Sequence, residues 1–278
     1  MSPAEFSAWH APALERDEVR HGLILGILAG AAGQHAANIT CWTLGGPGEC
    51  AIKAEGRSIV LGALRESECR TLAELTAHTD YPGVIGPDAS AEWFASRARE
   101  LGLEFQEPER QQIYAIGEPP RFPAASGHPR LVTRDDATLL SEWLTAFRRE
   151  AVPNDPVPPP GEGERAAGEG RFMFWIDNGQ PVSMAGIVRR LKTSAAITGV
   201  YTPPSMRGRG YAGSVTAATV ERVYAEGRKI ACLYADLNNP ISNRCYVRIG
   251  FRPGCGSLHI RRRGPDLIAE SSGRPGTA

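Results

Sequence analysis

The stretch Ala195–Ala212, AAITGVYTPPSMRGRGYA, decides how the rest of this sequence is interpreted. It predicts an apolar strand over residues 197–202, followed by a Pro-Pro turn and a basic glycine loop that leads directly into a helix. The backbone N–H groups at the start of a helix have no intrahelical partners, and the helix dipole favours negative charge there. The stretch therefore predicts a binding site for a phosphate or pyrophosphate group.

Arginine and glycine alternate in the loop itself. The arginines place positive charge where an anion would lie, and the glycines let the backbone approach that anion closely. We expect the anion to contact N–H groups along the loop and the first helical residues, which are Arg207, Gly208, Arg209, Gly210, Tyr211 and Ala212.

Composition narrows the class of protein. The chain has 278 residues with 42% hydrophobic and 22% charged residues, which predicts a packed core. Lys+Arg and Asp+Glu are equal at 31 each, which argues against a dedicated nucleic-acid or anionic-membrane binder. The six cysteines form no C-x-x-C pair, so we expect no metal site and reduced thiols in a cytoplasmic protein. The apolar run 22–33 is too short to span a bilayer and predicts a buried helix.

Composition shifts along the chain predict two halves. Residues 119–129 are rich in proline, glycine and alanine and predict a linker, so we place an N-terminal domain at 1–124 and a C-terminal domain at 125–263. Residues 264–278 predict a disordered tail. We expect residues 1–14 to be loosely held and the proline-rich segment 153–170 to be an exposed, mobile loop. The turn Asp177–Gly179 predicts a hairpin.

One interpretation of the glycine loop is a dinucleotide fingerprint. Gly208, Gly210 and Gly213 match G-x-G-x-x-G, and Asp236 falls near the position of a ribose-binding acid. The context disfavours it, because five residues separate the strand from the first glycine and the strand belongs to an antiparallel hairpin unit.

A second interpretation rests on two motifs. Arg207, Gly210 and Ala212 match the pattern R/Q-x-x-G-x-G/A, and residues 239–251 match N-x-x-A-x-x-x-Y-x-x-x-G-F with serine in place of alanine. Together they resemble the acyl-CoA loop and the following segment of the GNAT acetyltransferase superfamily, over roughly residues 125–263. The resemblance implies an α+β fold with a mixed sheet, and the subgroup that it suggests has an extra N-terminal half. We expect that half to be a degenerate copy of the same fold.

The resemblance also implies a cofactor and site residues. Acetyl-CoA would be the cosubstrate, with its pantetheine arm along Val200, Tyr201 and Thr202. Tyr246 matches a position that often donates a proton to the departing thiolate, although a core aromatic would also suit it. Asn239 matches a position that commonly bonds the pantetheine, and a helix cap is compatible with that role.

The proton acceptor is less well defined. The loop strand holds no carboxylate, so Asp236 is the nearest acid that we place beside the cleft. Capping or salt-bridging is the alternative role for Asp236, and a water relay from a backbone carbonyl is another route for the proton. We expect an N-acetyltransferase that acts on a small-molecule or peptide amine by direct attack. The N-terminal half would shape the acceptor pocket or a homodimer contact. A non-catalytic acyl-CoA-binding module is the rival interpretation.

Overall fold

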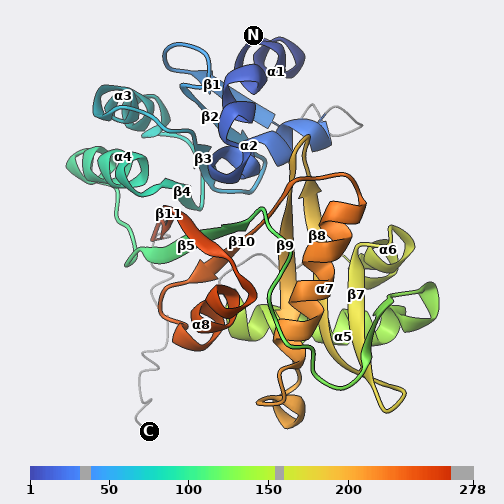
Figure 1. Ribbon diagram of the computed structural model, residues 1–278. Helices are drawn as coiled ribbons and strands as arrows, with labels where there is room; N and C mark the ends of the chain where they lie inside the picture. The colour runs from blue at the N-terminus through green and yellow to red at the C-terminus, as the bar shows by residue number, and fades with distance from the viewer. Residues whose placement is uncertain (32–38, 154–159, 264–278) are drawn as a thin grey trace, which may run out of the picture.

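The computed structural model describes residues 1–31, 39–153 and 160–263. One mixed sheet runs through these stretches in the order β1-β2-β3-β4-β11-β5-β10-β9-β8-β7-β6 (Figure 1). The strands are β1 (Ile39–Thr43), β2 (Cys50–Ala54), β3 (Ile59–Leu61), β4 (Gly83–Pro87), β5 (Glu109–Ile116), β6 (His128–Leu131), β7 (Phe172–Asp177), β8 (Gln180–Arg190), β9 (Ser194–Tyr201), β10 (Ile230–Asp236) and β11 (Arg252–Arg261). The helices are α1 (Pro3–Leu14), α2 (Glu18–Ala31), α3 (Glu66–Thr76), α4 (Asp88–Glu100), α5 (Ala137–Ala151), α6 (Glu162–Gly168), α7 (Tyr211–Ala225) and α8 (Pro240–Ile249). The expected mixed α+β fold is confirmed.

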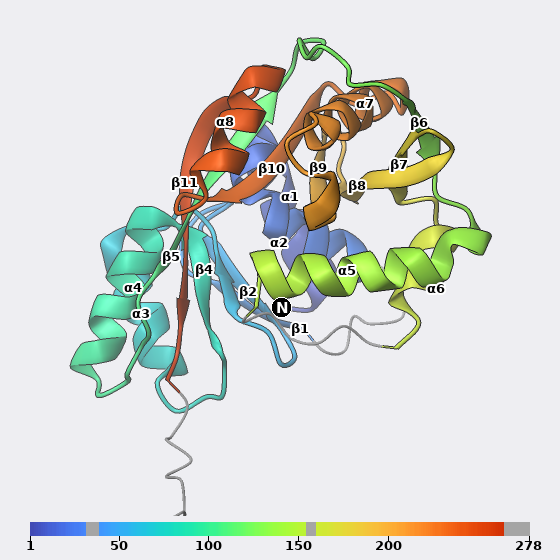
Figure 2. The same ribbon diagram turned by 90° about the horizontal axis from the view of Figure 1, so that it is seen from below.

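Helices cover both faces of the sheet. On one face α3 and α4 pack on Leu258, and α7 and α8 pack on Tyr114. Leu258 of β11 pairs with Arg110 of β5, so their side chains lie on the same face of the sheet. Tyr114 is four residues further along β5 and lies on that face too, because side chains alternate along a strand. The four helices therefore cover the same face. The other face is covered by α1 and α2 at one end and by α5 and α6 at the other (Figure 2).

The order of elements repeats along the chain. The succession β3-α3-β4-α4-β5 recurs as β9-α7-β10-α8-β11, and in both copies the first two strands are parallel. The last strand of each copy lies beside the other copy, because β5 pairs with β10, β11 pairs with β4, and β5 and β11 pair with each other. The two halves therefore share one sheet through exchanged strands. The domain limits at 1–124 and 125–263 stay a prediction, and the tail 264–278 lies outside the described residues.

Two segments differ from the sequence-based expectation. Residues 1–14 form α1, whose start is fixed by a capping box between Ser2 and Glu5. His10 on this helix is buried and bonds both the Thr43 hydroxyl and the Gly48 N–H. Part of the expected mobile loop is the short helix α6, which packs against α5 through the close approach of Gly163 to Ser141. Proline and glycine content did not reveal these tertiary contacts.

The hydrophobic run near residue 22 forms the buried helix α2, as expected. It crosses the sheet and contacts strands of both halves, from β2 and β3 to β8 and β9. Among the described residues, no helix combines the length and the hydropathy needed to cross a membrane.

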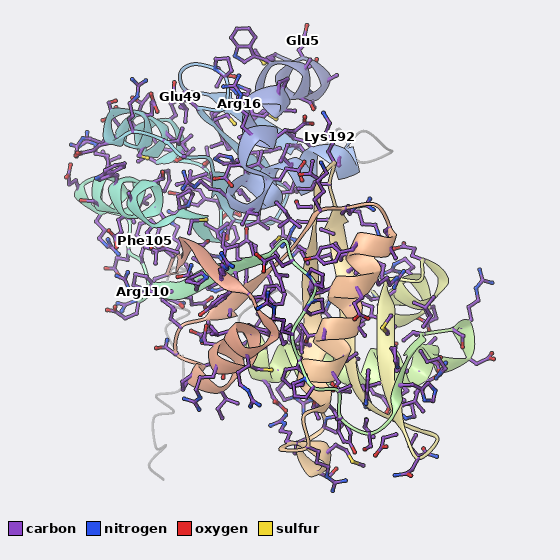
Figure 3. The ribbon with its side chains drawn as sticks, in the orientation of Figure 1. Glu5, Arg16, Glu49, Phe105, Arg110 and Lys192 are labelled. Carbon is purple, nitrogen blue, oxygen red and sulfur yellow. The ribbon has the colours of Figure 1, made fainter. Side chains whose placement is uncertain are left out.

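A buried carboxylate ties the first turn of α2 to the start of β9. Glu18 is 4% exposed and accepts hydrogen bonds from the N–H groups of Thr193 and Ser194 and from the Ser194 hydroxyl, at 2.7–3.1 Å. Lys192, next to this contact, lies beside the same N-terminal helices (Figure 3). The position of β9 thus depends on an acceptor from the other half of the chain.

We expect Glu18→Ala to lower the free energy of unfolding by about 3 kcal/mol, because it leaves buried N–H donors without an acceptor. Glu15→Ala is the matched control, since the ion pair of Glu15 within the described residues is with the exposed Lys192, at 3.4 Å. The control should cost less than about 1 kcal/mol. Urea denaturation measures both values, and equal losses would contradict the assigned role of Glu18.

Candidate functional site

The two central parallel strands of the C-terminal half separate along their length. β9 and β10 pair only where Ser194–Ala196 lies beside Ile230–Cys232. Beyond that point β9 continues to Tyr201 beside β8, and β10 continues to Asp236 beside β5. The backbone of β9 that faces β10 over residues 197–201 therefore has no strand partner. Such an edge can accept an extended, amide-bearing ligand as an additional strand.

A β-bulge interrupts β9 within this separated part. Thr198 pairs with Gly186 and Tyr201 pairs with Met184, so two residues of β9, Gly199 and Val200, oppose one residue of β8. Gly199 has φ +60°, and a Cβ there would lie 2.8 Å from the Phe172 ring. A bulge of this kind leaves the extra residue unpaired and bends the strand. An isolated glycine in a strand is a sequence signal for such a bulge, so Gly199 could have revealed it before the structure did.

The loop after β9 presents a row of free backbone donors. Among the described residues, the N–H groups of 208–213 have no hydrogen-bond acceptor, and the regular helical pattern begins with the Ser214 N–H donating to the Gly210 carbonyl. Gly208 and Gly210 have φ values of +78° and +84°, a region that glycine adopts without strain. The row lies at the positive end of the 15-residue helix α7. This is the geometry of an anion site at a helix N-terminus.

The Arg207 side chain, in contrast, has protein partners. Its Nε donates to the Thr202 carbonyl at 2.9 Å, and its Nη2 pairs with the Glu150 carboxylate of α5 at 2.6 Å. About half of each side chain is exposed, so the pair can exchange partners with solvent or with a ligand. Direct contact between the Arg207 guanidinium and an anion stays a prediction.

Side chains around the loop hold it in place. The Tyr211 hydroxyl donates to Asp177 at 2.6 Å, which ties the first residue of α7 to the β7–β8 turn. This hydrogen bond is the main reason why the pKa of the Asp177 carboxyl lies below its ordinary value, and Arg209 lowers it further. The Thr202 hydroxyl bonds the Ser183 hydroxyl at 2.8 Å. Tyr211 and Thr202 thus use their side chains for support, and the Thr202 carbonyl also accepts the bond from Arg207 Nε.

Tyr246 lies on the buried side of α8. It is 9% exposed, with the rings of Tyr114 and Phe251 about 6 Å away, at 6.2 and 6.0 Å between centroids. Burial raises the pKa of the Tyr246 hydroxyl, so the group stays protonated at neutral pH. Among the described residues no hydrogen bond engages this hydroxyl. Its position is compatible with proton donation and with core packing.

Asp236 and Asn239 both act as caps. Asp236 is exposed, and its carboxylate accepts the Asn238 N–H at 2.8 Å. The Asn239 side chain is the N-cap of α8 and accepts the Ser242 N–H at 3.1 Å. The sequence-based roles of these residues in catalysis and cofactor binding stay predictions. The structure places both at the open end of β10, beside the gap.

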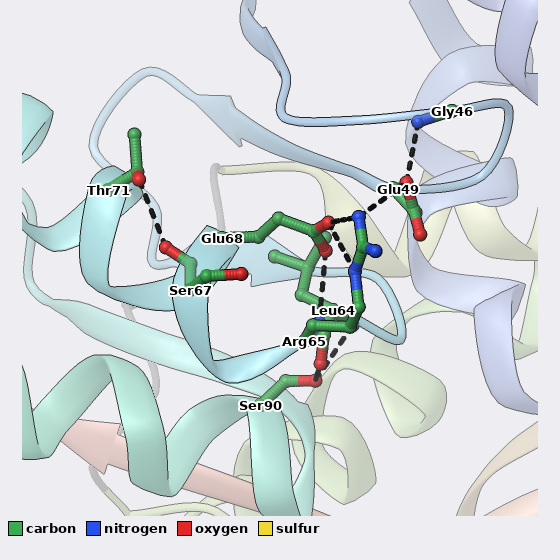
Figure 4. A network of polar contacts seen from close by, with 8 residues as sticks. All are labelled: Gly46, Glu49, Leu64, Arg65, Ser67, Glu68, Thr71 and Ser90. Carbon is green, nitrogen blue, oxygen red and sulfur yellow. Dashed lines mark hydrogen bonds and ion pairs between the residues drawn. The ribbon is translucent and has the colours of Figure 1, made fainter.

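The corresponding helix start in the N-terminal half has its own acceptors (Figure 4). Ser90 accepts the Leu64 N–H at 3.0 Å, and the Glu68 carboxylate accepts the Arg65 N–H at 3.0 Å. Glu68 also pairs with the Arg65 guanidinium, and Glu66 adds a second negative charge in the first turn of α3. The bonded donors directly precede α3, and the negative side chains in its first turn repel a phosphate.

The predicted linker is part of the site's surroundings. Residues 117–127, here called the strap, cross the outer side of α7 between β5 and β6 (Figures 1 and 2). Ala125 donates its N–H to the Ser214 hydroxyl at 2.8 Å, and the Trp175 indole donates to the Ser126 carbonyl at 2.8 Å. Composition predicted a connection here and gave no signal for these contacts.

We expect Tyr211→Phe to raise the pKa of the Asp177 carboxyl towards its ordinary value, because the hydroxyl that stabilises the ionised form is removed. A depressed carboxyl pKa stabilises the fold above the unfolded pKa, and this contribution is lost as pH falls through the folded pKa. An NMR titration of Asp177 measures the change. Tyr224→Phe is the control, since the Tyr224 hydroxyl bonds the Ile116 and Glu118 carbonyls and no carboxylate in the described part of the chain. An unmoved Asp177 titration in Tyr211→Phe would contradict the assignment.

Comparisons with known proteins agree with this architecture. Residues 176–256 match the model of the FR47-like protein family. A GCN5-related N-acetyltransferase from Kribbella flavida aligns over 88% of this chain and 96% of its own, with 19% identity and a TM-score of 0.57. A GCN5-related N-acetyltransferase from Sphaerobacter thermophilus aligns over 96% of this chain and 96% of its own, with 16% identity and a TM-score of 0.56.

A Drosophila protein aligns over 95% of this chain and 97% of its own, with 12% identity and a TM-score of 0.68. No curated protein matches the sequence. These identities are low, so the similarity of the whole chains concerns the fold, while the family match concerns the segment from the end of β7 into β11. The chain has the fold of these GCN5-related N-acetyltransferases, and its residues 176–256 match the FR47-like family model.

Proposed function

We propose that this protein is a CoA-dependent N-acetyltransferase that transfers an acetyl group from acetyl-CoA to a primary amine. The observation that carries the proposal is the row of free N–H groups at 208–213, next to two parallel strands that separate. A pyrophosphate suits the first feature, and the extended, amide-bearing pantetheine arm suits the second. CoA contains both groups in one molecule.

The backbone supplies most of the cofactor contacts in this proposal. The pyrophosphate lies on the N–H groups of residues 208–213, and the pantetheine amides bond the backbone of Val200 and Tyr201 at the end of β9 and of Thr202 just after it. The bulge at Gly199 turns a β9 N–H towards the thioester carbonyl, where it stabilises the developing oxyanion. A single donor of this kind is worth about 3 kcal/mol in the transition state.

The reaction then needs two proton transfers. The neutral amine attacks the thioester carbonyl carbon, so that a C–N bond forms and the C–S bond breaks. Asp236, or a water that it holds, takes the proton that leaves the amine nitrogen. Tyr246 donates its hydroxyl proton to the departing CoA thiolate. The raised pKa of Tyr246 ensures that this proton is present at neutral pH.

One observation favours a second candidate, a non-catalytic acyl-CoA-binding module. The Asp236 carboxylate is engaged by its own turn, and within the described residues the Tyr246 hydroxyl bonds no group that would orient it. Release of free CoA during incubation with acetyl-CoA and a panel of primary amines separates the two candidates. Tight binding without amine-dependent release would favour the binding module.

We expect Gly210→Val to weaken acetyl-CoA binding at least about tenfold. A β-branched residue adopts the positive φ of this position only with strain, so the backbone would shift and displace the free N–H groups of 208–213, here called the donor row. Gly227→Val is the matched control: it has φ +83° at the other end of α7, and a Cβ added there would meet no atom within 4 Å. Both variants should lose similar stability, whereas only Gly210→Val should lose affinity in calorimetry. Unchanged affinity in Gly210→Val would refute the assignment of the loop.

We expect Tyr246→Phe to lower turnover about 100-fold with little change in acetyl-CoA affinity, because only the transferable proton is removed. Tyr114→Phe is the control, since Tyr114 packs against the same ring. Turnover is measured as CoA release with an amine that the wild-type protein accepts. Equal turnover in Tyr246→Phe and wild type would show that Tyr246 is a packing residue.

A further inference from the structure

The strap forms a wall beside the free N–H groups of α7. The Ala125 Cβ lies 3.7 Å from the place that a Cβ on Gly210 would occupy. The Phe122 ring fills the space next to Gly213, so that a Cβ at Gly213 would overlap it. Gly213 therefore allows the Phe122 ring to lie directly against the first turn of α7, whereas Ala125 approaches Gly210 at an ordinary contact distance.

The strap also contacts the end of α8. Its Arg121 N–H donates to the Ile249 carbonyl at 2.8 Å. The Arg248 guanidinium lies over the Phe122 ring, 5.7 Å from the centroid, in a cation–π contact. Arg248 and Gly213 thus both lie next to the Phe122 ring, Arg248 over its face and Gly213 at its edge. A positive charge from α8 is held close to the last N–H groups of the row.

Arg248 is available to bind an anion. It is exposed, and no carboxylate pairs with it in the part of the chain that the structure describes. Neighbouring arginines differ in this respect: Arg252 pairs with Glu118 at 3.3 Å, and Arg207 pairs with Glu150. A guanidinium binds a phosphate through parallel, charge-assisted hydrogen bonds. The ring beneath Arg248 limits its conformations and lowers the entropy lost on binding.

Resting on the proposed function, we propose that Arg248 binds the 3′-phosphate of the CoA adenosine and that Phe122 positions it. When the pyrophosphate occupies the donor row and the pantetheine enters the gap, the adenosine leaves along the strap. Its 3′-phosphate is the remaining anionic group. Arg248, held over the Phe122 ring of the strap, is a cation beside it that has no carboxylate partner among the described residues. Through Phe122, the strap thereby gives the C-terminal half a preference for CoA over 3′-dephospho-CoA.

The test compares the affinities of acetyl-CoA and acetyl-3′-dephospho-CoA, measured by calorimetry on the full chain. The wild type should prefer acetyl-CoA by about tenfold or more, as expected for a hydrogen-bonded charged group. Arg248→Ala should remove this preference by weakening acetyl-CoA binding alone. Phe122→Ala should reduce it, and Phe122→Trp, which keeps an aromatic face under Arg248, should retain it.

Arg99→Ala is the matched control, because Arg99 lies over Phe105 in the N-terminal half at 5.5 Å and carries the same charge. It should keep the wild-type preference. A wild type that binds both ligands equally, or an Arg248→Ala protein that still prefers acetyl-CoA, would overturn the inference while leaving the proposed function in place. A wild type that binds neither ligand would refute the proposed function, and the inference with it.

Discussion

Within the described residues, the backbone donors at the start of α7 lack acceptors, and the proposed function depends on that fact. Every helix begins with N–H groups that cannot be satisfied within it. In the N-terminal half the two N–H groups before α3, of Leu64 and Arg65, bond Ser90 and Glu68, and two glutamates lie in the first turn. The first turn of α7 holds no carboxylate. Two similar arrangements of strands and helices thus differ in the charge and hydrogen bonding next to one helix terminus.

The exchanged strands explain why the two halves stay together although only one has the donor row. β5 completes the sheet beside β10, one wall of the gap, and β11 completes the sheet beside β4. Glu18 adds a polar contact from α2 to the start of β9. The strand that lines the gap is therefore held by elements of both halves. A loss of packing in the N-terminal half would change the geometry of the gap without any change in the site itself.

The sequence predicted the local elements of the site better than their surroundings. The loop at 207–212 and the helix after it depend on glycine conformations and helix termini, which are local properties that residue types encode directly. The hairpin at Asp177–Gly179 is local in the same way. The engagement of Arg207 by Glu150 is different, because it depends on the end of α5 lying beside β9. No spacing in the sequence specifies such a contact between distant segments.

The strap shows why composition is a poor guide to the role of a linker. Proline and alanine near residue 120 correctly predict that neither a helix nor a strand forms there. They carry no information on what the extended chain touches, since its contacts come from partners far along the sequence, such as Ser214, Trp175 and Arg248. An extended segment has its own N–H and C=O groups to satisfy, and α7, α8 and β7 offer partners for them. A connection of this kind is fixed by the surfaces that it crosses, so its position beside the donor row follows from the packing of the helices beneath it.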